Sequence, residues 1–216
     1  MKEFIDLSVP FESLATPAWP GLPRPLKASF TSFKDSISQT NLWIFNEHTG
    51  THVDSAAHFV EDGVTIERVP ISRCMGNAVV LDFSTKPPKC EISKADIMEA
   101  LKHRDETRIG RGWILLFYTG YTSKMGTIQW GDYPGLTDDA CRFIAELEVN
   151  AIGADAPAID HEPYPAHKLL LPLGITIYEN LTNLQKLLDR KFVFVGVPLP
   201  LVKGTASPVR AFAMTL

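Results

Sequence analysis

The chain has few cysteines, no surplus of positive charge and no long hydrophobic run. Its three cysteines, Cys74, Cys90 and Cys141, lie far apart and form no CxxC pair. That spacing argues for reduced thiols in a cytosol, and against a disulfide framework or a cysteine-ligated zinc site. The net charge of −4 offers no electrostatic basis for binding nucleic acid or an anionic membrane. The longest apolar runs, 113–118 and 192–202, are too short or too interrupted by proline to span a bilayer.

Length and composition indicate an ordinary globular protein. The 216 residues include 45% hydrophobic and 21% charged residues, which is enough for one substantial core, and we expect residues 1–216 to form a single domain. The first six residues contain acidic side chains where a signal peptide needs an apolar run. A cytoplasmic location is therefore expected.

The pattern of apolar residues predicts an α/β fold with a mixed sheet. Strand-like segments dominate the first half and alternate with helix-like segments in the second half, which suggests a mixed or parallel core with added antiparallel pairs. The predicted strands are 4–9, 28–33, 41–45, 77–83, 113–118, 151–154, 175–178, 192–197 and 209–214. The predicted helices are 94–103, 138–147, 166–171 and 181–188.

A proline-rich segment, Pro10 to Pro25, follows the first predicted strand and contains Trp19. Its many fixed φ angles predict an irregular loop rather than a flexible linker. Trp19 has two interpretations that the sequence leaves open. It is either a plug that pins the loop to the core, or an aromatic wall for a planar ligand.

The most informative stretch is His48 to Phe59, which reads HTGTHVDSAAHF and holds three of the six histidines. A helix would bring His48 and His52 together but turn Asp54 to the far side. In a fully extended chain, at about 3.3 Å per residue, His48 and Asp54 would lie about 20 Å apart, too far to share one ion. We therefore expect the chain to curl here, with Gly50 permitting the bend.

Three histidines and one aspartate within this stretch favour a metal site over structural hydrogen bonding, because each buried imidazole would otherwise need its own partner. Two imidazoles and a carboxylate leave coordination positions open for water, which is the catalytic pattern. His58 would then be the remaining histidine, free to move protons.

The stretch resembles the HxGTHxDxxxHF signature of the cyclase family of metal-dependent hydrolases, which includes the bacterial kynurenine formamidases and isatin hydrolase. The likeness extends over nearly the whole chain. It includes the IDLS segment at 5–8, the TPAWPG loop at 16–21, GADAPAID at 153–160, HKLLL at 167–171 and ENL at 179–181.

The resemblance implies a site residue by residue. The implied metal ligands are His48, His52, Asp54, His167 and Glu179, with Asp54 bridging two ions. His58 would be the proton donor and acceptor, and Trp19 the substrate-contacting aromatic. The implied cofactor is zinc, two ions per subunit, with manganese as the alternative because these ligands suit both metals. Without the family, the sequence favours an exposed helix residue over a metal ligand at His167.

The resemblance also implies a fold, a reaction and an assembly. The fold is the swivelling β/β/α domain with a mixed central sheet and flanking helices, and family members are homo-oligomers, dimers or larger. The expected reaction is hydrolysis of an amide-like C–N bond in a small aryl amide, namely N-formylkynurenine giving kynurenine and formate in tryptophan catabolism. The alternatives are a related hydrolase of cyclic amides or lactones, such as isatin, and a non-catalytic metal-binding protein.

Two departures from the family pattern bear on the substrate. Ser55-Ala56 stands where relatives carry Ala-Pro, which predicts a looser turn, and Ala158 stands where relatives tend to carry serine. Asp155 and Asp160 are either partners that orient metal-bound imidazoles or turn-capping residues. His103 and His161 are interpreted as polar loop or surface residues.

Overall fold

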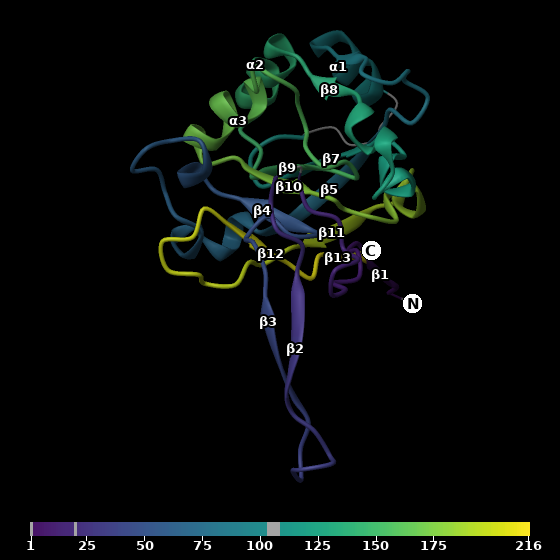
Figure 1. Cartoon of the computed structure of the whole chain (residues 1–216). Coiled ribbons are helices and arrows are strands. Elements are labelled where there is room, and N and C mark those ends of the chain that lie inside the picture. Colours follow the sequence, from purple (N-terminus) through teal and green to yellow (C-terminus); the bar gives the residue numbers. More distant parts are fainter. Residues whose placement is uncertain (1, 20, 103–108) are drawn as a thin grey trace.

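A nine-stranded mixed sheet forms the centre of the protein in a computed structural model, which describes residues 2–19, 21–102 and 109–216. Its strand order is β1-β13-β11-β5-β7-β9-β10-β4-β12 (Figure 1). The strands are β1 (Phe4–Asp6), β4 (His52–Asp54), β5 (Met75–Asp82), β7 (Ile114–Tyr118), β9 (Ala151–Ala154), β10 (Thr176–Glu179), β11 (Phe192–Val195), β12 (Ala206–Pro208) and β13 (Phe212–Thr215).

The four central strands, β5, β7, β9 and β10, are parallel, and antiparallel strands extend the sheet on both sides. Parallel strands are covered on both faces and so read as nearly continuous apolar runs. The run Ile114–Tyr118 is an example, since its first four residues are buried. The predicted mixed α/β fold is confirmed.

Three helices, α1 (Lys94–Lys102), α2 (Asp138–Glu146) and α3 (Pro165–Leu170), lie on one side of the sheet (Figure 1). Thr137 caps α2 by accepting a hydrogen bond from the amide of Ala140, as its position predicts. A short sheet of β6 (Glu91–Ile92) and β8 (Gly135–Leu136) joins this layer. Among the described residues, no helix has both the length and the apolar character that crossing a bilayer requires. His103, at the predicted end of the first helix, lies outside the described residues.

The remaining helical elements are single 3₁₀ turns. They span Ala56–His58, Ile66–Arg68, Ile71–Arg73, Tyr121–Lys124, Ile128–Asp132, Leu171–Leu173 and Leu184–Leu187.

The helix predicted for 181–188 is wrong, because only Leu184–Leu187 forms a 3₁₀ turn there. Asn183, just before that turn, has a left-handed φ of 60°. Leu181 is drawn into a β-bridge with Ser8 and donates its amide to the carbonyl of Ala154. Leu181, Leu184 and Leu187 pack into the hydrophobic core without forming a continuous helix. Tertiary contacts here override the local helical pattern.

The segments predicted as strands at 28–33 and 41–45 form a hairpin, β2 (Leu26–Thr31) and β3 (Thr40–Ile44), that projects away from the body (Figure 1). Cross-strand partners share a face of an antiparallel pair. One face therefore carries the apolar pairs Leu26–Ile44 and Ala28–Leu42. Leu26, Leu42 and Ile44 are all exposed, so this apolar face meets solvent in the single chain.

Candidate metal centre

The bend expected after His48 is present, and it places the side chain of His48 next to that of Asp54. Gly50 has a left-handed φ of 65°, which a glycine adopts without steric cost. Strand β4 follows immediately, so His52 and Asp54 are both buried in the sheet. As a result His48 Nδ1 lies 2.9 Å from Asp54 Oδ1.

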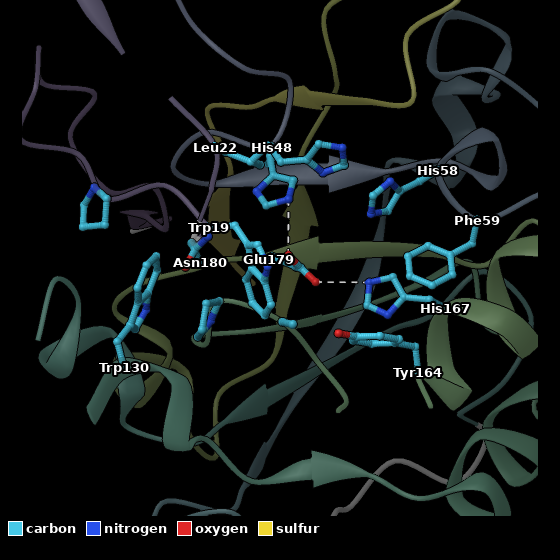
Figure 2. Close-up of a pocket in the computed structure, with 14 residues that line it drawn as sticks. Trp19, Leu22, His48, His58, Phe59, Trp130, Tyr164, His167, Glu179 and Asn180 are labelled. Carbon is cyan, nitrogen blue, oxygen red and sulfur yellow. Dashed lines mark ion pairs between the residues drawn. The ribbon is translucent and has the colours of Figure 1, made fainter. Parts of the chain in front are cut away.

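Two distant segments complete the cluster. Strand β10 pairs antiparallel with β4 and sets Glu179 opposite His52, with 3.3 Å between Glu179 Oε2 and His52 Nε2. Helix α3 supplies His167, whose Nε2 lies 3.4 Å from Glu179 Oε1 and 3.7 Å from Asp54 Oδ2. Figure 2 shows Glu179 between the imidazoles to which the dashed lines connect it.

Hydrogen bonds on the far side of each ring determine which nitrogen faces the carboxylates. The carbonyl of Gly50 can only accept, so His52 donates from Nδ1 to it over 2.9 Å and turns its Nε2 lone pair inward. His167 Nδ1 faces the Asp160 carboxylate at 2.8 Å, which leaves its Nε2 inward in the same way.

His48 is held in the opposite sense. Its Nε2 lies 3.3 Å from the Thr205 hydroxyl, which itself donates to the carboxylate of Glu47 over 2.7 Å. The hydroxyl therefore accepts from His48 Nε2–H, and Nδ1 turns its lone pair toward Asp54. In their neutral forms, the three imidazoles thus present lone pairs to two carboxylates.

These inward atoms have no hydrogen-bond partners. His52 Nε2, both oxygens of Asp54 and Glu179 Oε1 are buried and unpaired among the described residues. A buried polar atom without a partner costs about 1–3 kcal/mol, so four in one place need an explanation. A cation satisfies all of them at once. Two ligand groups share Asp54, since the ligand atoms of His48, Asp54 and His58, and those of His52, Asp54 and Glu179, each lie within 4.8 Å of one another.

The electrostatics of the cluster reflect the closely spaced carboxylates. Burial alone would lower the pKa of His52, but the charges of Asp54 and Glu179 outweigh it and raise that pKa to about 9. The pKa of His167 rises well above its usual value despite burial, chiefly through its hydrogen bond to Asp160. Burial opposes ionisation of Asp54, yet its histidine neighbours hold the pKa of this carboxyl well below the usual range. The site therefore attracts positive charge.

His58 sits beside this cluster, at the end of the 3₁₀ turn that follows β4. Its ring centre lies 4.2 Å from that of His48 and 6.0 Å from that of His167. Partial burial lowers the pKa of His58, against the attraction of Asp54, although the side chain remains accessible from solvent. The imidazole is therefore largely neutral near pH 7 and reachable from the cavity.

A cavity of about 260 Å³ opens onto the cluster (Figure 2). Trp19 lines it from the proline-rich loop and is 40% exposed, so of the two interpretations a cavity wall describes its position better than a buried plug. Sequence reasoning did not single out the other lining residues, which are Pro17, Leu22, Phe59, Trp130, Pro157, Tyr164 and Asn180. Phe59 and Asn180 directly follow named site residues in the sequence, and that adjacency was the available signal.

The remaining residues named from sequence take distinct places. Asp160 is fully buried and holds His167, whereas Asp155 accepts hydrogen bonds from Thr119 and Gly120 at the turn after β7, away from the cluster. His161 is a partly buried loop residue that stacks on Tyr133.

The two departures from the family pattern lie at the site. Ser55 is buried and its hydroxyl donates to the carbonyl of Thr205 over 2.8 Å, so a hydrogen bond anchors the turn that the lack of a proline predicted to be looser. Ala158 lines the cavity.

Comparison with known proteins gives one consistent family. The model named Cyclase, described as "Putative cyclase", matches residues 5–161. A kynurenine formamidase of Geobacillus thermodenitrificans is 28% identical over 215 residues, covering 98% of this chain and 97% of the relative. A "predicted metal-dependent hydrolase" from Bacillus stearothermophilus superposes with a TM-score of 0.80 at 25% identity, covering 99% and 98% of the two chains. Isatin hydrolase A from Labrenzia aggregata has the same fold, with a TM-score of 0.87 at 23% identity and coverage of 99% and 93%.

Proposed function

Because the chain belongs to the cyclase family, we propose that it is a metal-dependent hydrolase of an amide-like C–N bond. The substrate of this proposal is N-formylkynurenine, cleaved to kynurenine and formate, as in tryptophan catabolism. Relatives named kynurenine formamidase, 28–29% identical over nearly the whole chain, support this choice.

One observation carries the proposal: imidazole lone pairs and carboxylate oxygens converge, buried and unpaired, at the floor of a cavity lined by aromatic residues. This donor set fits a divalent cation. The residues that would hold it are His48, His52, Asp54, His167 and Glu179. Within the proposal the metal would be zinc, up to two ions per chain because Asp54 belongs to both possible ligand groups, and manganese is the alternative.

In the mechanism that follows, a bound metal supplies Lewis-acid polarisation of the formyl oxygen and a lowered pKa for the attacking water. His58 takes the proton of that water, because its imidazole is neutral, accessible and beside His48. It then returns the proton to the departing aniline nitrogen. Trp19, which lines the cavity, would stack against the aryl ring of the substrate.

A hydrolysis assay on purified protein tests the proposal and separates it from the alternatives. With metal loading verified, we expect N-formylkynurenine to be cleaved faster than isatin or simple lactones. Faster opening of isatin would indicate a cyclic-amide hydrolase instead. No hydrolysis of any of these compounds by fully loaded protein would indicate a metal-binding protein without this activity.

Asp160 provides a first prediction. Its carboxylate is hydrogen-bonded to His167 Nδ1 and also accepts hydrogen bonds from the backbone amides of Ala166 and His167. It thereby fixes both the ring and the start of α3. Replacing it as Asp160→Asn should weaken metal binding by about 10- to 100-fold, measured by competition with a chelator. Asp155→Asn is the matched control, since Asp155 is also a buried carboxylate on backbone amides. Equal losses in the two variants would mean that Asp160 has only a structural role.

The same proposal includes a homo-oligomer, and the projecting hairpin supports it. An isolated two-stranded hairpin is marginally stable in water, and three or more strands or a packed face are usually needed. The apolar face of β2 and β3 is exposed along its length. A second copy of the chain, which carries the same face, would cover it by a symmetric contact.

Placing a charge on that face tests the assembly. Leu42→Lys should convert a dimer or tetramer into monomers, because a lysine cannot be buried unpaired in an apolar contact. The measurement is molar mass by light scattering during size-exclusion chromatography. Asn41→Lys, on the opposite face of β3, is the control and should leave the mass unchanged. A wild-type monomer at micromolar concentration would contradict the assembly.

Two further expectations are carried within the proposal. Residues 1–216 act as one hydrolase domain, because the ligands come from both halves of the chain. The location is the cytoplasm, in keeping with three free thiols at Cys74, Cys90 and Cys141.

A further inference from the structure

Tyr164, the residue just before α3, has an unfavourable backbone conformation. Its φ of 60° and ψ of 57° lie in the left-handed region, which a bulky side chain rarely adopts. Its amide donates to the carbonyl of His161 over 2.7 Å, and its carbonyl accepts from the amide of Lys168 over 3.1 Å. Such conformations persist where the surrounding structure holds them, and they gather at functional sites. The backbone here therefore sets the direction of the Tyr164 side chain.

Two aromatic neighbours hold the Tyr164 ring at the wall of the cavity. Its ring centre lies 5.7 Å from that of Phe59 and 6.1 Å from that of His167, and both contacts are edge to face. Such geometry is favourable for aromatic pairs. Figure 2 shows the ring beside His167, with the hydroxyl directed into the cavity. The contacts position the ring and leave the hydroxyl unused.

The Tyr164 hydroxyl is accessible as well as unused. No described residue pairs with it, and its oxygen is not one of the buried unpaired atoms, whereas the Tyr121 hydroxyl is. The residue as a whole is partly exposed and lines the cavity. A tyrosine hydroxyl carries one proton that it can donate. A molecule in the cavity can therefore accept a hydrogen bond from Tyr164 without any rearrangement of the protein.

The surroundings of His167 place this donor near the expected chemistry. Among the described residues, the rings that neighbour His167 are those of His58, Phe59 and Tyr164, with centres at 6.0, 4.6 and 6.1 Å. Phe59 has no polar atom, and His58 is assigned to proton transfer. A carbonyl group held against the cluster in front of His167 thus has His58 as its proton carrier and Tyr164 as its remaining neighbour able to donate.

We propose that the Tyr164 hydroxyl donates a hydrogen bond to the formyl oxygen as negative charge develops there during hydrolysis. This inference rests on the proposed function. When the oxygen of water bonds to the formyl carbon, the proton of that water passes to His58 and the electron pair of the C=O bond moves onto the formyl oxygen. The pair returns when the C–N bond breaks and His58 gives its proton to the nitrogen. A donor that waits at the developing charge stabilises the transition state more than the substrate.

Tyr164→Phe tests this role, because it removes the hydroxyl and keeps the ring between Phe59 and His167. It should lower kcat for N-formylkynurenine by about 10- to 100-fold and change KM by less than about threefold. Metal content should stay the same. Tyr121→Phe is the matched control, since it removes a buried, unpaired hydroxyl that does not line the cavity, and it should leave both constants unchanged.

Binding of two inhibitors to the metal-loaded proteins gives a readout that does not depend on turnover. Acetanilide has a neutral, planar carbonyl, whereas the monoanilide of methylphosphonic acid is tetrahedral and carries a negative oxygen. In titration calorimetry, Tyr164→Phe should bind the phosphonic anilide about 10- to 30-fold more weakly than the wild type does. Its affinity for acetanilide should be nearly unchanged.

The outcomes separate this inference from the function on which it rests. An unchanged kcat in Tyr164→Phe, or a raised KM at constant kcat, would overturn the role of the hydroxyl while leaving the hydrolase intact. Equal changes in affinity for the two inhibitors would overturn it as well. A metal-loaded wild type that does not cleave N-formylkynurenine would refute the proposed function instead.

Discussion

Replacing Asp54 with asparagine is expected to remove bound metal and to lower kcat/KM for N-formylkynurenine by about 1000-fold or more. Asp54 is buried where His48, His52 and His167 converge, with its oxygens 2.9, 3.5 and 3.7 Å from their ring nitrogens. Asparagine keeps the volume but loses the charge. Lewis-acid stabilisation is worth several kcal/mol, and each 1.36 kcal/mol is tenfold in rate.

Metal stoichiometry by mass spectrometry, measured beside the rate, tests this prediction. Asp155→Asn is the control, because it removes a buried carboxylate outside the cluster and should retain both metal and activity. An Asp54→Asn protein that keeps its full metal content and its rate would mean that the buried carboxylates do not form the metal site.

Replacing His58 with alanine is expected to lower kcat by about 10²- to 10⁴-fold while leaving the metal content unchanged. The basis is its position beside the cluster, 4.2 Å from the ring of His48. In the proposed mechanism, removing the imidazole takes away the group that would carry the proton to the departing nitrogen.

Adding free imidazole to His58→Ala should restore part of the rate, which loss of structure alone would not allow. The geometry offers a competing role, since a ligand atom of His58 lies within 4.8 Å of those of His48 and Asp54. Loss of one metal ion per chain in His58→Ala would assign His58 to the metal and remove it from proton transfer. An unchanged rate would exclude both roles.

The bend in the segment from His48 to Phe59 could be predicted, because the dimensions of helices and extended strands alone require it. Neither a helix nor an extended strand can bring His48 and Asp54 to one ion, and Gly50 was the residue able to bend. The structure has that bend, with a φ of 65° at Gly50 and a strand of only three residues after it.

The fold class could be predicted from the pattern of apolar residues. The helix predicted at 181–188 from the same kind of pattern does not form. Buried parallel strands such as β7 appear in the sequence as short, nearly continuous apolar runs. Leu181, Leu184 and Leu187 are buried too, but Leu181 bridges to Ser8 and Asn183 adopts a left-handed φ. A contact with a residue far away in the chain is invisible to local periodicity.

His167 and Glu179 could be assigned to the cluster only through the family resemblance, because no local sequence pattern marks them as ligands. His167 precedes an apolar run and could have been an exposed helix residue. It faces Glu179 only because α3 packs beside the end of β10 and Asp160 turns its ring inward. Trp130 and Tyr164 reach the cavity from a 3₁₀ turn and a loop, and their spacing in the sequence carries no sign of it.

The central claim is that the buried cluster holds a catalytic metal, and chelation with re-addition tests it most directly. Protein as purified should contain one or two zinc ions per chain and cleave N-formylkynurenine. After exhaustive chelation it should be inactive, and added zinc should restore the rate in proportion to the metal bound. A metal-free protein that cleaves N-formylkynurenine at the full rate would contradict the account.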